Sequence, residues 1–164
     1  MSKKTINISE TELRSMISSS IKRNMLKEEE EQDNVQEADN SGFKSKATNF
    51  LNKLEGYHQA LKVLHWTAEN NHKHTLTDDI DGSVLKFEDK VAEVVMGIIG
   101  ERITSLDSDK PSSTDLKGLL DELKRDILEF LDEFEDKRDY RGLVNVCDDF
   151  LSDVETDKYL DDLK

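Results

Sequence analysis

Two histidines and three acids near the middle of the chain are of the residue types that bind metal ions: His65, His74, Asp78, Asp89 and Glu93. Imidazole and carboxylate groups together are ligands for divalent iron, zinc or manganese. If the segment after His74 is helical, Asp89 returns to within roughly 20° of the face that carries Asp78, and Glu93 lies about one turn further on. The spacing therefore predicts a metal-binding face on one helix.

The same spacing places these ligands too far apart to share a metal within one chain. At a rise of 1.5 Å per residue, Asp78 and Asp89 are separated by roughly 16 Å along the helix. An antiparallel copy of the helix, related by a two-fold axis, would place Asp89 and Glu93 of one subunit opposite His65, His74 and Asp78 of the other, because a two-fold contact is self-complementary. We therefore predict a metal site between subunits and a homo-oligomer that contains at least this dimer.

The pattern resembles the ferroxidase signature of the Dps proteins, a ferritin-like family that protects DNA. It consists of the tripeptide Leu64-His65-Trp66, the pair His74-x-x-x-Asp78 and the pair Asp89-x-x-x-Glu93. The resemblance implies that His65, His74 and Asp78 bind iron from one subunit, while Asp89 and Glu93 come from its neighbour. It also implies oxidation of Fe(II) by peroxide or dioxygen at a di-iron or mono-iron site, and it leaves open storage of the product in an oligomeric shell.

The resemblance covers residues 44 to 164 approximately, and this chain differs from the family in three places. The loop between His65 and His74 is shorter by about three residues. The helix that the family carries between its second and third bundle helices is not expected here. A long N-terminal extension is added.

The N-terminal extension has its own organisation. Residues 8–26 form an amphipathic pattern in which Ser9 and Glu12 match a capping box, and residues 28–39 hold seven acids and no base. The segment Ile8–Ile17 resembles short N-terminal helices that recur on tailed-phage proteins. We therefore divide the chain into residues 1–42, a targeting or docking helix with an acidic flexible linker, and residues 43–164, the bundle. A protein or capsid partner is expected to bind residues 8–26.

Charge and composition limit the other partners. The whole chain carries a formal net charge of −14, and because residues 1–27 carry +4, the remainder carries −18. Strong DNA binding is not expected, because affinity for DNA comes from neutralising its phosphates with basic side chains. Cys147 is the only cysteine, and no apolar run is long enough to span a membrane. We expect a soluble protein, either cytoplasmic or packaged in a phage particle, with no membrane contact.

Apolar spacing in the second part of the chain predicts four helices. We expect them near residues 44–70, from Thr75 to about Leu106, from an N-cap at Thr114 onward, and after a tight reversal at residues 137–139. The expected fold class is all-α, an antiparallel ferritin-like four-helix bundle with an N-terminal extension. The expected core contains Phe50, Leu51, Leu54, Leu61, Leu64, Ile80, Val84, Phe87, Val91, Val94, Val95, Ile98, Leu116, Leu119, Leu123, Ile127, Phe130, Phe134, Leu143, Val146, Cys147, Phe150, Val154 and Leu160.

Several residues also have simpler interpretations. His58 and His72 are expected to be structural histidines, and Trp66 a packing residue at a helix end. Gly97 and Gly100 either permit a close subunit contact or mark the end of a helix. Two alternatives to an iron oxidase stay open. One is a ferritin-like structural protein of a phage virion with a vestigial metal site, and the other is a helical adaptor that binds no metal.

Overall fold

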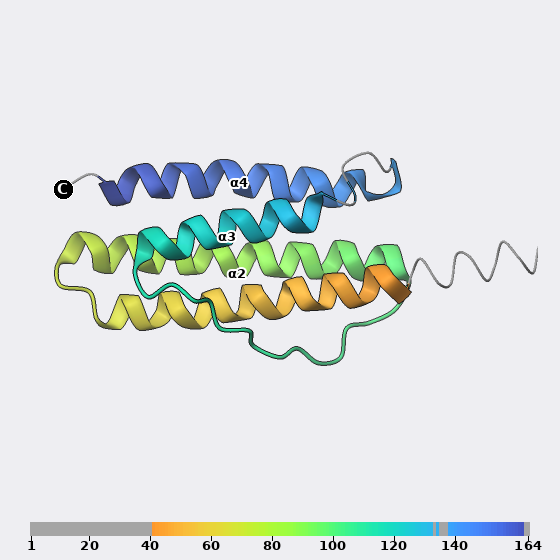
Figure 1. The fold of residues 1–164 in the computed structure, drawn as a ribbon, viewed down its shortest axis with the longest axis horizontal. Coiled ribbons are helices and arrows are strands. Elements are labelled where there is room, and N and C mark those ends of the chain that lie inside the picture. The colour runs from red at the N-terminus through yellow and green to blue at the C-terminus, as the bar shows by residue number, and fades with distance from the viewer. Residues whose placement is uncertain (1–40, 133, 135–137, 163–164) are drawn as a thin grey trace, which may run out of the picture. The chain divides into compact units, whose positions relative to one another are not determined.

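The computed structural model describes residues 41–132, 134 and 138–162 (Figure 1). Residues 41–66 are helical, and they are followed by α2 (Asn71–Ile99), α3 (Leu116–Leu131), a short 3-10 turn η1 (Arg138–Tyr140) and α4 (Arg141–Asp162). No strand occurs among these described residues, so the prediction of an all-helical fold is confirmed. The predicted docking helix at 8–26 and the acidic linker at 28–39 lie outside the described residues.

Side-chain contacts show how the helices run. His65 lies against His74 and Phe50 lies against Phe87, so the 41–66 helix and α2 run in opposite directions. Three lysine–acid ion pairs join α3 to α4. Residues near the beginning of α3 pair with residues near the end of α4, and the middle of α3 pairs with the second half of α4, so these two helices also run in opposite directions. The pairs are Lys117 with Asp162, Asp121 with Lys158, and Lys124 with Glu155. Adjacent helices in each of these pairs are therefore antiparallel.

The connection from α2 to α3 is long, and it crosses the length of the bundle. In Figure 1 residues 100–115 return past the 41–66 helix, so α2 and α3 run in the same direction. The prediction that the second helix continues to Leu106 is wrong. Gly100 ends it, with a left-handed φ of 68° and its N–H bonded to the Met96 carbonyl. A left-handed C-cap is a common helix terminus, and glycine adopts it without a Cβ penalty.

The helix N-caps also differ from the predicted residues. Asn70 caps α2 by accepting a hydrogen bond from the Lys73 backbone N–H at 2.9 Å, where we predicted Thr75. Asp115 caps α3 by accepting from the Gly118 N–H at 3.0 Å, where we predicted Thr114. Both observed caps carry a carbonyl or carboxylate oxygen, which makes them good acceptors for the free N–H groups of a first helical turn.

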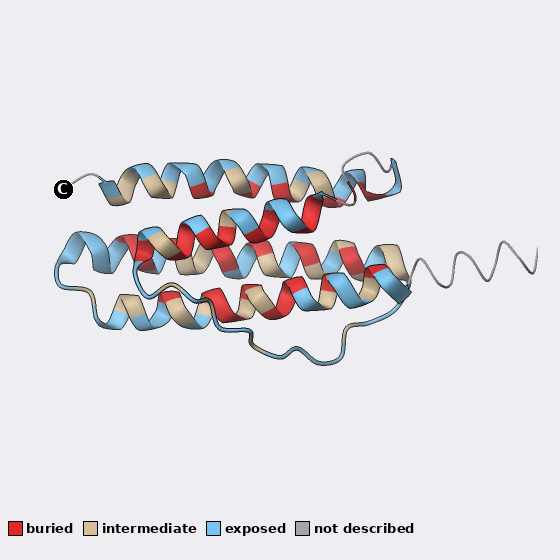
Figure 2. Ribbon diagram, viewed as in Figure 1, coloured by how far each residue is buried: buried red, intermediate tan, exposed pale blue. Residues whose placement is uncertain are grey.

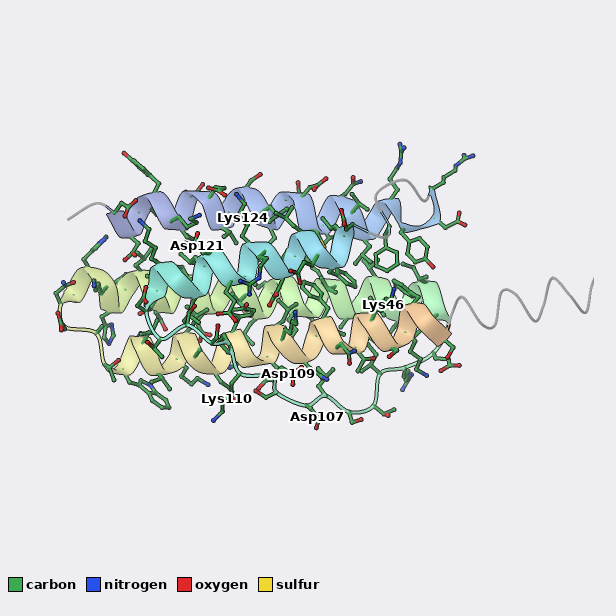
Figure 3. The ribbon with its side chains drawn as sticks, in the orientation of Figure 1. Lys46, Asp107, Asp109, Lys110, Asp121 and Lys124 are labelled. Atoms are coloured by element: carbon green, nitrogen blue, oxygen red, sulfur yellow. The ribbon has the colours of Figure 1, made fainter. Side chains whose placement is uncertain are left out.

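The crossing segment is fixed to the 41–66 helix by its backbone. Asp107 N–H donates to the side-chain oxygen of Asn52 at 2.8 Å, and Asp109 N–H donates to the Asn52 carbonyl at 2.9 Å. Gly56 lies one turn further along, where an added Cβ would be 1.8 Å from the Asp109 carbonyl oxygen. Figure 3 shows Asp107 and Asp109 on this segment beside the helix. The backbone of the crossing segment therefore packs directly against Gly56, where there is no room for a side chain.

The carboxylate of Glu122 fixes the end of the same connection. Glu122 accepts hydrogen bonds from the backbone N–H and hydroxyl of Ser112 and from the backbone N–H of Ser113, each with a closest approach of 3.0 Å. Burial raises the pKa of this carboxyl, but the serine hydrogen bonds outweigh burial and lower the pKa to about 2. Hydrogen bonds to the charged form favour ionisation. Glu122 therefore stabilises the fold only while it is ionised.

Replacing Glu122 with glutamine is expected to lower the free energy of unfolding at pH 7 by about 2 kcal/mol, a typical value for hydrogen bonds to a charged group. The folded-state pKa is below the unfolded value, so this stabilisation is present above about pH 4.5 and is lost as the pH falls toward 2. Urea unfolding of both proteins between pH 7 and pH 3 measures the difference. Glu129→Gln is the control, because Glu129 lies on the same helix and its side chain is 63% exposed.

The core is a single cluster that extends along the four described helices (Figure 2). Aromatic rings connect these helices: Phe50 stacks on Phe130 with centroids 4.2 Å apart, and Phe87 stacks on Phe150 at 4.0 Å. Cys147 is fully buried, as its place in the predicted core required, and burial raises the pKa of its thiol to about 12, which makes it unreactive. Most predicted core residues are buried, whereas Leu64, Val94, Ile98, Val146 and Leu160 are only partly buried at its edge.

In the part of the chain that the structure describes, every helix is either too short or too polar to cross a bilayer.

Candidate metal centre

His65 and His74 meet at the end of the bundle where the 41–66 helix turns into α2. Residues 67–70 make this turn, and Asn70 begins α2 immediately after it. The two imidazole rings are tilted by 49° with centroids 3.9 Å apart. The sequence separates these residues by nine positions, and the tight turn is what brings the rings into contact.

A hydrogen bond to the protein fixes the tautomer of His65. Its Nδ1 lies 3.0 Å from the backbone carbonyl of His74, and a carbonyl can only accept. Nδ1 therefore carries the proton, and Nε2 of the neutral ring keeps a free lone pair. Metal-binding histidines commonly have this arrangement, in which one ring nitrogen donates to a carbonyl while the other binds the ion. The side chain of His65 fits a metal ligand in this respect.

Asp78 completes the group formed within one chain. Its Oδ1 lies 3.8 Å from Nδ1 of His65, beyond hydrogen-bonding distance, and the Asp78 side chain is 70% exposed. The structure thus brings together His65, His74 and Asp78, the three residues that we predicted would act from one subunit.

Asp89 and Glu93 lie elsewhere on α2 and are exposed. Both are on the outer side of the helix, further toward its C-terminal end than Asp78 is. Among the described residues, no group of three or more histidine, cysteine or acidic side chains has the geometry to hold a metal. The described residues of a single subunit therefore do not form a metal site by themselves, and the predicted site between subunits stays a prediction.

Trp66 does not pack into the core of this chain. Its side chain is 71% exposed, and the neighbouring Val63 is 52% exposed. The prediction that Trp66 is a packing residue is therefore wrong for the single subunit. An indole next to His65 at the surface leaves apolar area uncovered beside the candidate site.

The other two histidines have structural partners, as we predicted. His58 Nδ1 lies 2.5 Å from Oδ1 of Asp81 in α2, with both side chains largely buried. His72 Nε2 lies 3.2 Å from the carbonyl of Leu160 in α4. These contacts join neighbouring helices, which accounts for the two residues without a metal.

Sequence reasoning missed a polar cluster between the 41–66 helix and α3. The hydroxyl of Tyr57 donates to Oδ2 of Asp126 at 2.8 Å, and Lys53 Nζ donates to Oδ1 at 3.0 Å. Burial and the adjacent Asp126 raise the pKa of the Tyr57 phenol. The available signal was Asp126 itself, an acid next to the apolar positions of α3. Because both carboxylate oxygens are already bonded, this cluster is structural.

An open groove of about 290 Å³ lies between the 41–66 helix, the end of the crossing segment and the start of α3. Its lining includes Ala60, Val63, Pro111 and Leu119. Titratable groups do not converge in it, since Lys110 is the only charged residue among those that line it. The groove therefore offers no chemistry that competes with the histidine site.

Comparisons with known proteins identify no relative of this chain. No protein-family model matches the chain, and no curated protein or solved structure matches it.

Proposed function

We propose that residues 43–164 form a Dps-type, ferritin-like bundle that binds Fe(II) between subunits and oxidises it. The observation that carries the proposal is the grouping of His65, His74 and Asp78 at one end of the bundle, with a free Nε2 on His65. The donors are mixed imidazole and carboxylate groups, which suit Fe(II) and also accept Zn(II) or Mn(II).

The connectivity supports the ferritin-like part of the proposal. Up-down bundles have short loops throughout, whereas ferritin-like bundles have one long crossover. Here the connection at residues 100–115 crosses the bundle, and the connections at 67–70 and between α3 and α4 are short. The two helix pairs on either side of the crossover are each antiparallel, as ferritin-like connectivity requires.

Each ligand would have a defined role toward the iron substrate. His65 and His74 would bind through neutral ring nitrogens, while Asp78 and the partner's Asp89 and Glu93 would balance the positive charge. Each Fe(II) gives up one electron, and hydrogen peroxide accepts a pair of electrons and a pair of protons to leave as water. The carboxylates favour this step because they stabilise the higher charge of the Fe(III) product.

Fe(II) oxidation by hydrogen peroxide, followed by absorbance under otherwise anaerobic conditions, tests the proposal. We expect oxidation well above the buffer rate at pH 7. His72→Ala is a matched control, since His72 lies on α2 but bonds to the Leu160 carbonyl, and it should leave the oxidation rate unchanged.

Oxidation at the buffer rate, in a protein shown to be folded and oligomeric, would contradict the proposal. It would favour the alternative of a ferritin-like structural protein, packaged in a phage particle, whose metal site is vestigial. In that case residues 8–26 would be the functional part of the chain, and their binding to a capsid protein would become the property to measure.

A further inference from the structure

We propose that the contact between α2 and α4 is pH-sensitive and holds α4 more tightly in mildly acidic solution than at neutral pH. Three carboxylates at the seam between the two helices are responsible: Asp79 in α2, and Asp153 and Asp157 in α4. None of them is a proposed iron ligand, so this property goes beyond the proposed function and does not depend on it.

The helices α2 and α4 pack along each other in opposite directions. Near one end of the seam, His72 in the first turn of α2 meets the carbonyl of Leu160 in the last turn of α4. Further along, the ring of Phe87 stacks on the ring of Phe150. These two contacts fix the register of the antiparallel pair.

The register brings Asp79 and Asp157 opposite each other. Asp79 lies eight positions before Phe87 in α2, and Asp157 lies seven positions after Phe150 in α4. Both are therefore about two turns from the stacked rings, in the same direction along the seam. Asp153 precedes Asp157 by about one turn, on the same side of α4. The three carboxylates thus form one cluster between the helices.

Basic side chains of α2 reach only one edge of this cluster. Lys86 and Lys90 line a polar groove of about 280 Å³ together with Asp153, but the groove does not include Asp79 or Asp157. In the described part of the chain, no lysine or arginine forms an ion pair with either of these two aspartates. The end of the seam that holds Asp79 and Asp157 is therefore left with uncompensated negative charge.

The charged residues of α3 that face this part of α4 are already paired. Lys117 of α3 bonds to Asp162, and Asp121 of α3 bonds to Lys158, the residue that follows Asp157. These pairs join α3 to α4, so their lysines do not neutralise the carboxylates between α2 and α4.

Protonation of Asp157 relieves the repulsion in this cluster. Burial, followed by the charges of Asp153 and Asp79, raises the pKa of the Asp157 carboxyl from its ordinary value of 3.8 to about 6. Because the folded-state pKa is above the unfolded value, stability is gained as the pH falls through 6, and the gain is complete below about pH 4. Glu122 acts in the opposite sense and at lower pH, so the two effects can be measured separately.

A carbon NMR titration of the aspartate carboxyl groups, in the full chain, tests the behaviour of Asp157 directly. Its midpoint is expected near pH 6. Asp79→Asn should lower that midpoint, because it removes the charge that faces Asp157. A wild-type midpoint near pH 4, or a midpoint that does not move in Asp79→Asn, would show that the two carboxylates do not interact and would overturn the proposal.

Urea unfolding of wild type and Asp157→Asn at pH 7.5 and pH 5 measures the effect on stability. The variant should unfold less readily than wild type at pH 7.5, and the ratio of the two unfolding constants is expected to change about tenfold between the two pH values. Asp148→Asn is the matched control, because Asp148 also lies on α4 but is exposed, and its ratio to wild type should stay constant.

Hydrogen exchange shows whether α4 itself responds. After correction for the intrinsic effect of pH on exchange, the amides of α4 in wild type should be several-fold better protected at pH 5 than at pH 7.5, and in Asp157→Asn the difference should disappear. Equal protection of α4 in wild type at the two pH values would overturn the proposal. So would a pH response of α4 that persists unchanged in Asp157→Asn.

Discussion

Replacing either His74 or Asp89 with alanine is expected to abolish Fe(II) oxidation. The two residues lie on the same helix, yet Asp89 is too far along α2 to join the group formed by His65, His74 and Asp78 within one chain. If both bind the same iron, they must come from different subunits. Each single variant then lacks a ligand at every site of the dimer, and the oxidation rate should fall to that of the buffer.

Mixing the two variants should restore part of the activity. In a mixed dimer one site lacks both ligands, whereas the other site has intact His74 from one subunit and intact Asp89 from its partner. Random pairing places half of the chains in mixed dimers, so about a quarter of the wild-type sites should be recovered. The measurement is the peroxide-driven oxidation rate after the variants are unfolded together and refolded.

The control for this experiment is a mixture of His65→Ala and His74→Ala. Both residues belong to the same predicted half-site, so in every mixed dimer one site lacks His65 and the other lacks His74. No recovery of the oxidation rate is expected. Mass spectrometry of the His74→Ala and Asp89→Ala mixture confirms that mixed dimers form. If they form and remain inactive, the ligands do not act across subunits, and the shared site is disproved.

The core was predictable because helical periodicity reports burial directly. Leu116, Leu119, Leu123 and Ile127 repeat at intervals of three and four, and all are buried on the inner side of α3. The partly buried exceptions lie at the edge of the same stripe, for example Val94 and Ile98 near the end of α2. The spacing of apolar residues in the sequence identifies the buried side of a helix, but it does not show which residues at the edge of that side are only partly buried.

The crossover was not predictable from the same pattern. Apolar residues continue past Gly100 at Ile103 and Leu106, so the periodicity extended the second helix beyond its end. The structure ends it at Gly100 and secures the following segment to Asn52 by backbone hydrogen bonds. Those bonds join residues more than fifty positions apart, and local propensity contains no information about them. The predicted helix was therefore too long, and the direction of α3 could not be assigned.

Only the proximity of some candidate residues was predictable, because residue spacing indicates which side chains can meet. His65, His74 and Asp78 were predicted to act from one subunit, and the structure groups them around the turn at 67–70. The hydrogen bond that fixes the His65 tautomer was not predictable, since its acceptor is a backbone carbonyl. The contribution of Asp89 and Glu93 depends on a second chain, and it stays a prediction until the mixing experiment is done.

The substitution with the largest expected effect on stability is Gly56→Ala. In most helices this change raises stability by up to about 1 kcal/mol, because alanine has the higher helix propensity. Here the new Cβ would lie 1.8 Å from the carbonyl oxygen of Asp109 and 2.6 Å from its carbonyl carbon. Both are backbone atoms held in place by the Asn52 hydrogen bonds, so the neighbour cannot move aside by changing a rotamer.

The crossover must therefore separate from the 41–66 helix, and it loses its contacts with Asn52 when it does. We expect the free energy of unfolding to fall by about 3 kcal/mol, at the upper end of the range for overpacked positions. Urea unfolding of the full chain, followed by circular dichroism, measures this loss. Gly97→Ala is the matched control, because Gly97 is also helical and an added Cβ there meets no atom within 4 Å. Equal stability of the two variants would mean that residues 107–110 do not pack against Gly56 in solution, and that the crossover is not anchored at this position.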